Sequence, residues 1–283
     1  KKFAWNAFRE SYRIGKDNLI QEDALFNYAK LSYELSYNPY NEAIDALKTY
    51  IKEYPRSPRL DEANGYLVDL FLSTRNYAGA IEALDNIQKK TPALYAAYQK
   101  VAYYRATELF NERKYEDAIQ MFTKSTEYEG ETALKAEAHY WIGESWYNLK
   151  QYDKALRYYN LFATMPGAFR SGLFKTTPYN AGYAHFQQKD YEKASIEFRK
   201  FLRDPGQADS KMKADAAIRT GDCFFIRKMY DQAITFYDQG IQFNAMDQDY
   251  ALYQKSLALG VLDRTQEKIE SLQHILSRYP RSP

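Results

Sequence analysis

The chain has 283 residues, of which 39 are Lys or Arg and 37 are Asp or Glu, so its net charge is only about +2. This balance gives no electrostatic reason to expect nucleic acid or an anionic membrane as a partner. No run approaches the roughly 18 apolar residues of a membrane-spanning helix, and the single cysteine, Cys223, excludes an intrachain disulfide framework. The 28 tyrosines contrast with three valines, which disfavours a β-rich fold because strands prefer β-branched residues.

The first residues, Lys-Lys-Phe-Ala-Trp, include no initiating Met, signal peptide or cleavage site, and we interpret them as the start of an excised segment. Residues 1–18 are predicted to form one leading helix whose partner helix is missing. This helix would leave Phe3, Trp5, Phe8 and Tyr12 at an uncovered end. Uncovered ends of repeat arrays favour end-to-end self-association, which we expect here.

A motif made of a tyrosine, two variable residues and an alanine, usually followed by Ile or Leu, recurs along the rest of the chain. Successive copies lie 37 to 39 residues apart, and a decayed seventh copy begins at Thr265. Such regular spacing indicates a repeat protein. We predict that the motif alanines are buried where paired helices cross: Ala43, Ala80, Ala118, Ala155, Ala194 and Ala233.

Each motif alanine has companions at fixed distances. A bulky residue lies four positions later, on the same helix face. In most copies a small residue lies twelve positions earlier, as with Gly143, Gly182 and Gly221. Because Gly inside a helix costs about 1 kcal/mol relative to Ala, we expect it to let a neighbouring helix approach closely. A Pro or Gly about twelve positions after the alanine, such as Pro92, predicts the end of a helix.

This pattern resembles the tetratricopeptide repeat, whose signature runs W-x2-L-G-x2-Y and then A-x3-F. No copy keeps the first aromatic residue of the signature. The resemblance implies an all-α fold, a right-handed α-solenoid of about seven helix pairs plus the leading helix. The best match in this chain consists of His139, Ile142, Gly143 and Trp146, followed by Ala155 and Tyr159.

We therefore predict a single elongated solenoid over residues 1–283. Its repeats would occupy 19–56, 57–91, 92–130, 131–167, 168–206, 207–246 and 247–283, after the leading helix at 1–18. The repeats exceed the usual length of about 34 residues. Because the distance from small residue to alanine is normal, the excess is expected at the junctions, as longer helices and as longer loops around 165–177 and 204–211.

Two junctions, at 54–58 and 279–283, share the residues Tyr-Pro-Arg-Ser-Pro. This junction resembles bacterial cell-envelope tetratricopeptide proteins of the outer-membrane assembly lipoprotein and Tol-Pal coordinator type. The resemblance implies the cell envelope or periplasm as the compartment, with the cytoplasm as the alternative. Because another repeat follows the first copy at once, the second copy predicts that the chain is cut from a longer array.

The sequence contains no nucleotide-binding, zinc-protease or serine-hydrolase motif. His139, His185 and His274 lie far apart, without partners at metal-ligand spacing. Cys223 stands beside two phenylalanines and is expected to be a buried, small apolar residue. We therefore expect a non-enzymatic protein with no catalytic residue, no metal and no cofactor.

In the resembled family, the first helix of each repeat lines a concave groove, and the position fifteen residues before the alanine faces it. Five of the seven residues at that position are tyrosine. Tyr offers a large contact area at low entropic cost, and Asn or Gln amides can pair with a peptide backbone. The implied partner-binding residues are Tyr103, Phe110, Asn111, Tyr140, Tyr147, Asn148, Tyr179, Tyr183, Phe186 and Gln187.

These residues favour a scaffold that binds a protein or peptide partner, while nucleic acid and direct membrane insertion are not expected. Tyrosines occupy the positions of the clamp lysines in chaperone-binding relatives, so chaperone C-termini are not expected as ligands either. Three alternatives stay open. The aromatic rows could only cement neighbouring repeats, the chain could be a structural spacer in a larger envelope assembly, or it could be the sensor domain of a regulator.

Overall fold

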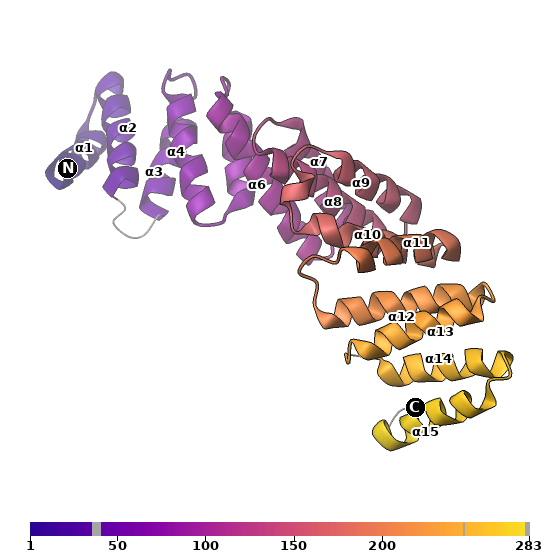
Figure 1. The fold of residues 1–283 in the computed structure, drawn as a ribbon. Coiled ribbons are helices and arrows are strands. Elements are labelled where there is room, and N and C mark those ends of the chain that lie inside the picture. Colours follow the sequence, from indigo (N-terminus) through magenta and orange to yellow (C-terminus); the bar gives the residue numbers. More distant parts are fainter. Residues whose placement is uncertain (36–40, 246, 281–283) are drawn as a thin grey trace. The chain divides into compact units, whose positions relative to one another are not determined.

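The computed structural model describes residues 1–35, 41–245 and 247–280. These residues form fifteen α-helices and one short 3-10 helix, with no strand among them (Figure 1). The predicted α-solenoid of helix pairs is confirmed, since seven pairs follow one leading helix. Within the described residues, no helix combines the length and the apolar character that crossing a membrane requires.

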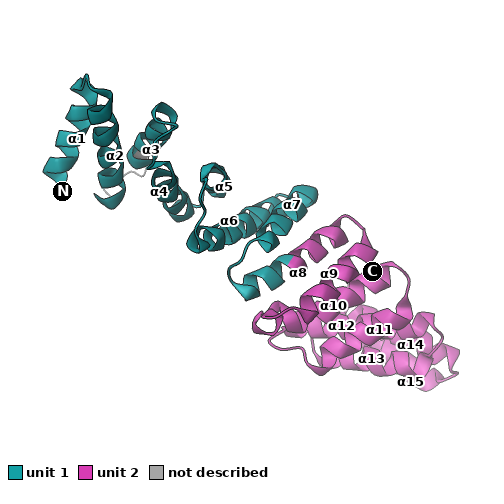
Figure 2. Cartoon of the chain, turned by 90° about the horizontal axis from the view of Figure 1, so that it is seen from above, with its two compact units in different colours: residues 1–138 teal, residues 139–283 magenta. Residues whose placement is uncertain are grey.

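The chain divides into two compact units, residues 1–138 and 139–283, and the division falls inside α8 (Figure 2). The first unit contains the leading helix α1 (Lys2–Ile14) and the pairs α2 (Asn18–Leu35) with α3 (Asn41–Glu53), α4 (Leu60–Ser73) with α5 (Tyr77–Asn86), and α6 (Pro92–Asn111) with α7 (Tyr115–Glu127). From α8 (Thr132–Asn148) onward, the pairs are α8 with α9 (Tyr152–Thr164), α10 (Leu173–Gln187) with α11 (Tyr191–Arg203), α12 (Ser210–Ile226) with α13 (Tyr230–Gln242), and α14 (Gln248–Val261) with α15 (Thr265–Arg278). The grouping of these pairs into one solenoid domain with the stated repeat boundaries stays a prediction.

A close contact between a glycine and an aromatic ring holds three of the helix pairs together. The glycine lies in the middle of the first helix, and the ring belongs to the bulky residue four positions after the motif alanine. The contacts join Gly143 to Tyr159, Gly182 to Phe198 and Gly221 to Tyr237, and a Cβ added to each glycine would lie only 2.6 to 2.8 Å from the ring. The expectation that the small residue admits the neighbouring helix is therefore confirmed.

The motif alanines lie at the same crossings. All six are buried, and none is more than 4% exposed. In the α8–α9 pair, a Cβ on Gly143 would lie 3.3 Å from the backbone carbonyl of Ala155, so glycine and alanine face each other across the pair. The prediction that these alanines are buried is confirmed.

All six pairs whose connecting turn is described are closed by the same three-residue turn, and none of these turns contains glycine. In the turn between α8 and α9, Lys150 adopts a left-handed backbone with φ of 58°. The N–H of Gln151 then donates to the Trp146 carbonyl at 2.9 Å, and the N–H of Lys150 donates to the Tyr147 carbonyl at 2.9 Å. These are the two bonds of the Schellman motif, which satisfies the last carbonyls of a helix. The corresponding left-handed residues are Arg75, Arg113, Lys189, Lys228 and Asp263.

The junctions between pairs contain the longer loops that the spacing predicts. The loop after α9 turns at Gly167, with φ of 91°, and includes a 3-10 helix at Ala168–Arg170. The loop after α11 turns at Gly206, with φ of 56°. The expectation for Pro92 is wrong, because this proline begins α6 after the cap residue Thr91 instead of ending α5. Proline is favoured in the first turn because its missing N–H has no helical partner there.

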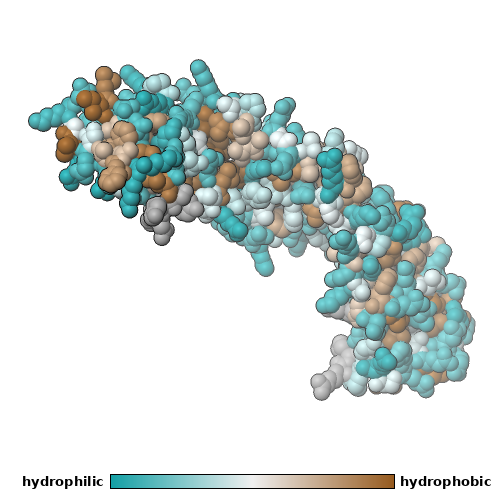
Figure 3. Space-filling model, turned by 60° about the vertical axis from the view of Figure 1, so that its left-hand side comes forward, coloured by the Kyte–Doolittle hydropathy of each residue, from teal (hydrophilic) through white to brown (hydrophobic). Residues whose placement is uncertain are grey.

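The leading helix packs more of its aromatic residues than the sequence suggests. Trp5 is half-buried. Its indole N–H donates to Ser32 Oγ at 2.8 Å, and its ring packs against that of Tyr28 with ring centres 5.5 Å apart. Tyr12 is also half-buried and donates to the Glu53 carboxylate at 3.0 Å. Phe3, by contrast, is 92% exposed. The apolar side chains near this end form separate patches among hydrophilic ones (Figure 3).

Two parts of the predicted motifs lie outside the described residues. Tyr40, which begins the first copy of the motif, is one of them. The other is the stretch 281–283, which completes the second Tyr-Pro-Arg-Ser-Pro junction.

A methyl group added at Gly182 should destabilise the protein. The Cβ of Gly182→Ala would lie 2.7 Å from the ring of Phe198, which is fully buried and has no room to move. Overpacking costs about 1–3 kcal/mol, against roughly 1 kcal/mol that Ala gains over Gly in helix propensity. We expect a net loss of about 1 kcal/mol in the free energy of unfolding, measured by urea denaturation.

Gly65→Ala is the matched control, because Gly65 lies inside α4 and an added Cβ meets no atom within 4 Å. There the propensity gain is unopposed, so the free energy of unfolding should rise by up to about 1 kcal/mol. Adding Phe198→Leu to Gly182→Ala should recover part of the loss by making room. Equal effects at Gly182 and Gly65 would show that the glycine–ring contact is not a tight one.

A glycine at the left-handed turn position should stabilise the protein. Lys150 has φ of 58°, a conformation that costs an L-residue roughly 1–2 kcal/mol and costs glycine nothing. Because glycine also loses more entropy on folding, we expect Lys150→Gly to raise the free energy of unfolding by about 0.5–1 kcal/mol. Gln151→Gly, at the next position with φ of −93°, is the control and should be neutral or destabilising. Thermal denaturation of both variants shows whether each substitution raises or lowers the stability of the protein.

Candidate functional site

In the first unit, the predicted groove residues divide between packing and surface positions. Tyr103 is only 8% exposed, packs edge-on against Phe122 and donates its hydroxyl to the Glu137 carboxylate at 3.0 Å. Phe110 is half-buried against the ring of Tyr115. Asn111, the last residue of α6, is exposed.

In the second unit, Tyr140 and Tyr179, two of the tyrosines at the groove-facing position, bond to the first helix of the following repeat. Tyr140 is 5% exposed, and its hydroxyl accepts a bond from Asn180 Nδ2 at 2.6 Å. Tyr179 is half-buried and donates to Asp215 at 2.9 Å. These hydroxyl contacts connect consecutive repeats, as aromatic rows that cement the array would do.

The second predicted row lies closer to the surface. Tyr147 packs edge-on against Tyr152, and Phe186 packs in the same way against Tyr191, both with ring centres 5.4 Å apart. The two amides of this row, Asn148 and Gln187, are exposed. The Asn148 amide donates to the Glu144 backbone carbonyl at 2.8 Å.

A cavity of about 230 Å³ gathers residues of α8, α9 and α10. Tyr147, Tyr179 and Tyr183 line it and belong to the predicted groove. Three further lining residues, Glu144, Tyr159 and Asn180, were not predicted as site residues. We call these six residues the tyrosine pocket. The part of the prediction that the structure brings together is therefore the central stretch of the second unit.

The packing of the helix pair explains how Glu144 enters the tyrosine pocket. It follows Gly143 directly, and Gly143 admits the ring of Tyr159. The hydroxyl at the end of that ring then donates to Glu144 Oε1 at 2.7 Å. Asn180 Nδ2 donates to the same oxygen at 2.5 Å. The position of Glu144 directly after the packing glycine is thus the feature of the sequence that could have identified it as a pocket residue.

Glu144 is a half-buried carboxylate without a cationic partner among the described residues. Burial raises its pKa above the ordinary value of Glu, although the hydrogen bonds from Tyr159, Asn180 and Tyr140 favour the charged form and oppose the shift. No lysine, arginine or histidine within the described ranges forms an ion pair with it. Burial and the nearby Glu144 charge also raise the pKa values of the Tyr140 and Tyr159 hydroxyls, so both stay protonated near neutral pH.

The α12–α13 pair contains a comparable carboxylate that does have a cation. Asp222 follows Gly221 as Glu144 follows Gly143, and it accepts a hydroxyl bond from Tyr237 at 3.0 Å. Arg219, one turn earlier on α12, pairs with Asp222 at 2.7 Å. In the α10–α11 pair the ring is Phe198, which has no hydroxyl, and the residue after Gly182 is Tyr183. Among these three pairs, an acidic residue follows the glycine in the two whose ring is a tyrosine, and not in the one whose ring is a phenylalanine.

Cys223 and His139, which the sequence analysis considered for chemistry, pack against neighbouring residues. Cys223 is fully buried, and burial raises the pKa of its thiol to about 12, which makes it a poor nucleophile. The ring of His139 stacks on that of Tyr158, with ring centres 6.0 Å apart. Among the described residues, no three His, Cys, Asp or Glu side chains form a group that could hold a metal ion.

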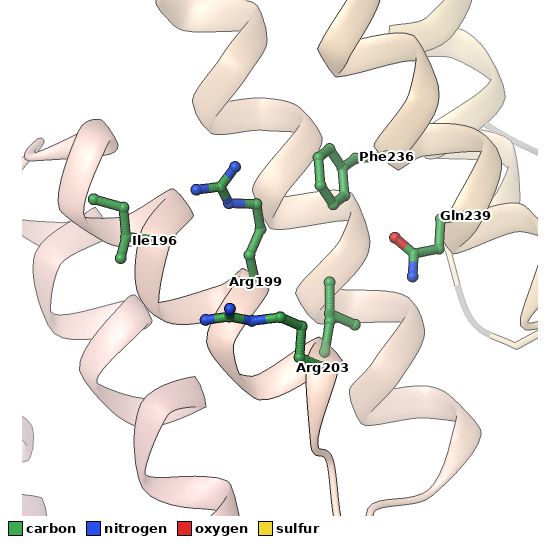
Figure 4. A pocket seen from close by; sticks show the side chains of 6 residues that line it. Ile196, Arg199, Arg203, Phe236 and Gln239 are labelled. Carbon is green, nitrogen blue, oxygen red and sulfur yellow. The ribbon is translucent and has the colours of Figure 1, made fainter.

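A second cavity, of about 400 Å³, lies along α11 and α13. Arg199 and Arg203 extend from one face of α11, while Phe236 and Gln239 stand on α13 (Figure 4). Both arginines are exposed, so water solvates their charges. Sequence reasoning did not include this cavity, because it considered only the first helix of each repeat.

Comparison with protein families supports the repeat assignment. Two family models, each described as a tetratricopeptide repeat, match the chain, one at residues 23–57 and the other at 103–168 and 179–248. Together these matches cover more than half of the chain. No curated protein matches the sequence significantly.

Solved structures show a similar fold at low sequence identity. The chain is similar to the C-terminal part of a TPR repeat-containing protein from Cytophaga hutchinsonii, with 15% identity and a TM-score of 0.51, over 91% of this chain and 96% of that one. It is also similar to MamA, from residue 41 to its end, of Desulfovibrio magneticus RS-1, with 13% identity and a TM-score of 0.52, over 65% of this chain and 98% of that one. At such identities the likeness concerns the fold alone.

Removing the Glu144 charge should stabilise the protein in a pH-dependent way. Because the folded pKa is raised, the folded state holds more protons than the unfolded state between the ordinary and the raised pKa. Stability therefore falls as pH rises through that window. Glu144→Gln has no proton to lose, so it should be more stable than wild type at pH 7, and this gain should vanish below the ordinary pKa of Glu.

Asp69→Asn is the matched control for this measurement. Asp69 lies on α4 at the repeat position of Glu144, eleven residues before the motif alanine, and also accepts a tyrosine hydroxyl, from Tyr33 at 3.2 Å. Unlike Glu144 it is exposed, so its stability difference should stay within about 0.5 kcal/mol. Urea unfolding at several pH values measures both variants. A Glu144→Gln variant less stable than wild type at pH 7 would show that hydrogen bonding to the carboxylate outweighs its burial.

Proposed function

The chain belongs to the tetratricopeptide repeat family, and on that premise we propose that it binds an extended segment of a protein partner along the tyrosine-rich first helices of its repeats. Tetratricopeptide repeats are protein-interaction scaffolds, and a non-enzymatic role for this chain agrees with that. The proposed binding surface in the second unit centres on the tyrosine pocket and the exposed amides beside it.

One observation carries the proposal. Three of the predicted groove tyrosines, Tyr147, Tyr179 and Tyr183, line a common cavity instead of being sealed in separate packing contacts. Tyrosine is enriched at interfaces because it combines apolar area with a polar end. The exposed amides of Asn148 and Gln187 lie on the same helices, where they can pair with a peptide backbone.

A structural spacer is the second candidate, and a different observation favours it. Tyr103 and Tyr140 are buried, and their hydroxyls bond to Glu137 and Asn180 on the next first helix. Such contacts hold repeats at a set distance without any ligand. In a spacer, the tyrosine pocket would be only a by-product of packing.

Selection from a library of random 12-residue peptides displayed on phage tests the binding role. We expect the immobilised 283-residue protein to enrich a defined set of sequences. Tyr147→Ala should weaken their binding more than fivefold, which corresponds to about 1 kcal/mol, because Tyr147 lines the pocket and is only half-buried.

Tyr95→Ala is the control for this test. Tyr95 is a tyrosine on α6 that is 40% exposed, and it is not among the predicted groove residues. Its replacement should leave peptide affinity unchanged. The absence of any enriched peptide, or equal losses at Tyr95 and Tyr147, would favour the spacer.

A further inference from the structure

The tyrosine pocket has an unusual electrostatic composition. It contains one carboxylate, that of Glu144, and otherwise only tyrosines and an asparagine. The donors that reach the carboxylate are neutral groups, those of Tyr159, Asn180 and Tyr140. Neutral donors lower the cost of burying a charge, but they do not cancel it. The pocket therefore keeps a negative charge that the chain itself does not neutralise.

The α12–α13 pair shows how this fold neutralises a carboxylate at the same position. Asp222 receives two tyrosine hydroxyls, from Tyr237 at 3.0 Å and Tyr250 at 3.1 Å, and also the guanidinium of Arg219 at 2.7 Å. Three positions before Glu144, where Arg219 stands relative to Asp222, the chain has Trp141. A cation is thus present in one site and replaced by an aromatic residue in the other.

The walls of the tyrosine pocket also suit a cation. An ammonium or guanidinium group within about 6 Å of a tyrosine ring gains roughly 0.5–2 kcal/mol from the negative face of the ring. Four tyrosines line the pocket around Glu144. Its volume of about 230 Å³ lies below the roughly 300–1,000 Å³ of pockets that hold drug-sized ligands, so it has room for a single side chain.

We propose that the tyrosine pocket receives a lysine or arginine side chain of the bound partner segment, with Glu144 as its counter-ion. This inference rests on the proposed function and names the residue type that the partner must present. The raised pKa of Glu144 agrees with it, because an incoming cation would supply the stabilisation of the carboxylate that the apo pocket lacks. Retaining a buried charge at a cost to stability is also typical of functional sites.

The test is the same random 12-residue phage library, selected in parallel on wild type, Glu144→Gln and Asp69→Asn. Gln keeps the shape and the acceptor oxygen of Glu144, so the packing around Tyr159 is retained. On wild type we expect Lys or Arg to be enriched at least fivefold over the naive library at one position of the selected peptides. Glu144→Gln should bring that enrichment back to background while still selecting peptides.

Asp69→Asn removes the same charge at the same repeat position in the first unit, so it should keep the basic preference. This control separates a specific counter-ion from a general change of net charge. Circular dichroism and thermal denaturation verify that each variant is folded before selection.

The possible outcomes separate the two proposals. Enriched peptides without a basic preference, or a preference that persists on Glu144→Gln, would overturn the inference and leave the peptide-binding function standing. Absence of enriched peptides on wild type would overturn both. If butylammonium chloride raises the melting temperature of wild type but not of Glu144→Gln, while no basic peptide is selected, the pocket takes a free amine and the partner-segment inference is wrong.

Discussion

The close approach of paired helices at a glycine is the constraint on which the rest of the structure depends. A Cβ added to the glycine would lie only 2.6 to 2.8 Å from the aromatic ring. Glycine is therefore the one residue that fits at this position. The contact determines how near the two helices lie, and it buries the motif alanine at the same crossing. It also decides where the end of the ring points. Since Tyr159 carries a hydroxyl, its packing against Gly143 delivers that hydroxyl to Glu144.

This geometry connects packing to electrostatics. A tyrosine in the contact needs an acceptor at its buried end, because an unsatisfied hydroxyl is costly. Glu144 and Asp222 provide that acceptor in two of the pairs, whereas Phe198 needs none and is accompanied by Tyr183. Each acceptor brings with it a charge that is largely shielded from water, since Asp222 is buried and Glu144 is half-buried. The chain neutralises the charge of Asp222 with Arg219 and leaves that of Glu144 to neutral donors. The same fold element thus carries an internal ion pair in one repeat and, in our proposal, takes its cation from a partner in another.

Much of the fold could be predicted because it depends on local spacing. Six motif alanines at near-constant intervals indicated helix pairs, and the alanines are buried. Pro92 was misjudged because proline is compatible with both ends of a helix, and only the cap at Thr91 decides between them. The sequence left open whether the predicted groove tyrosines bind a partner or only cement neighbouring repeats, and two of them, Tyr103 and Tyr140, are buried. Tyr103 and Tyr140 are covered by residues 34 to 40 positions later, and the repeat spacing does not specify those partners.

By itself, the sequence determined that this protein is built from helix pairs, and which glycine and which bulky ring meet inside three of them. These features follow from helical periodicity, which acts over a few residues. The tertiary structure decided which tyrosines are buried in packing contacts and which line a cavity. It also decided that Glu144 is half-buried and has no cationic partner among the described residues. Both depend on side chains that arrive from neighbouring helices, because burial and charge compensation are properties of the whole packed neighbourhood of a residue.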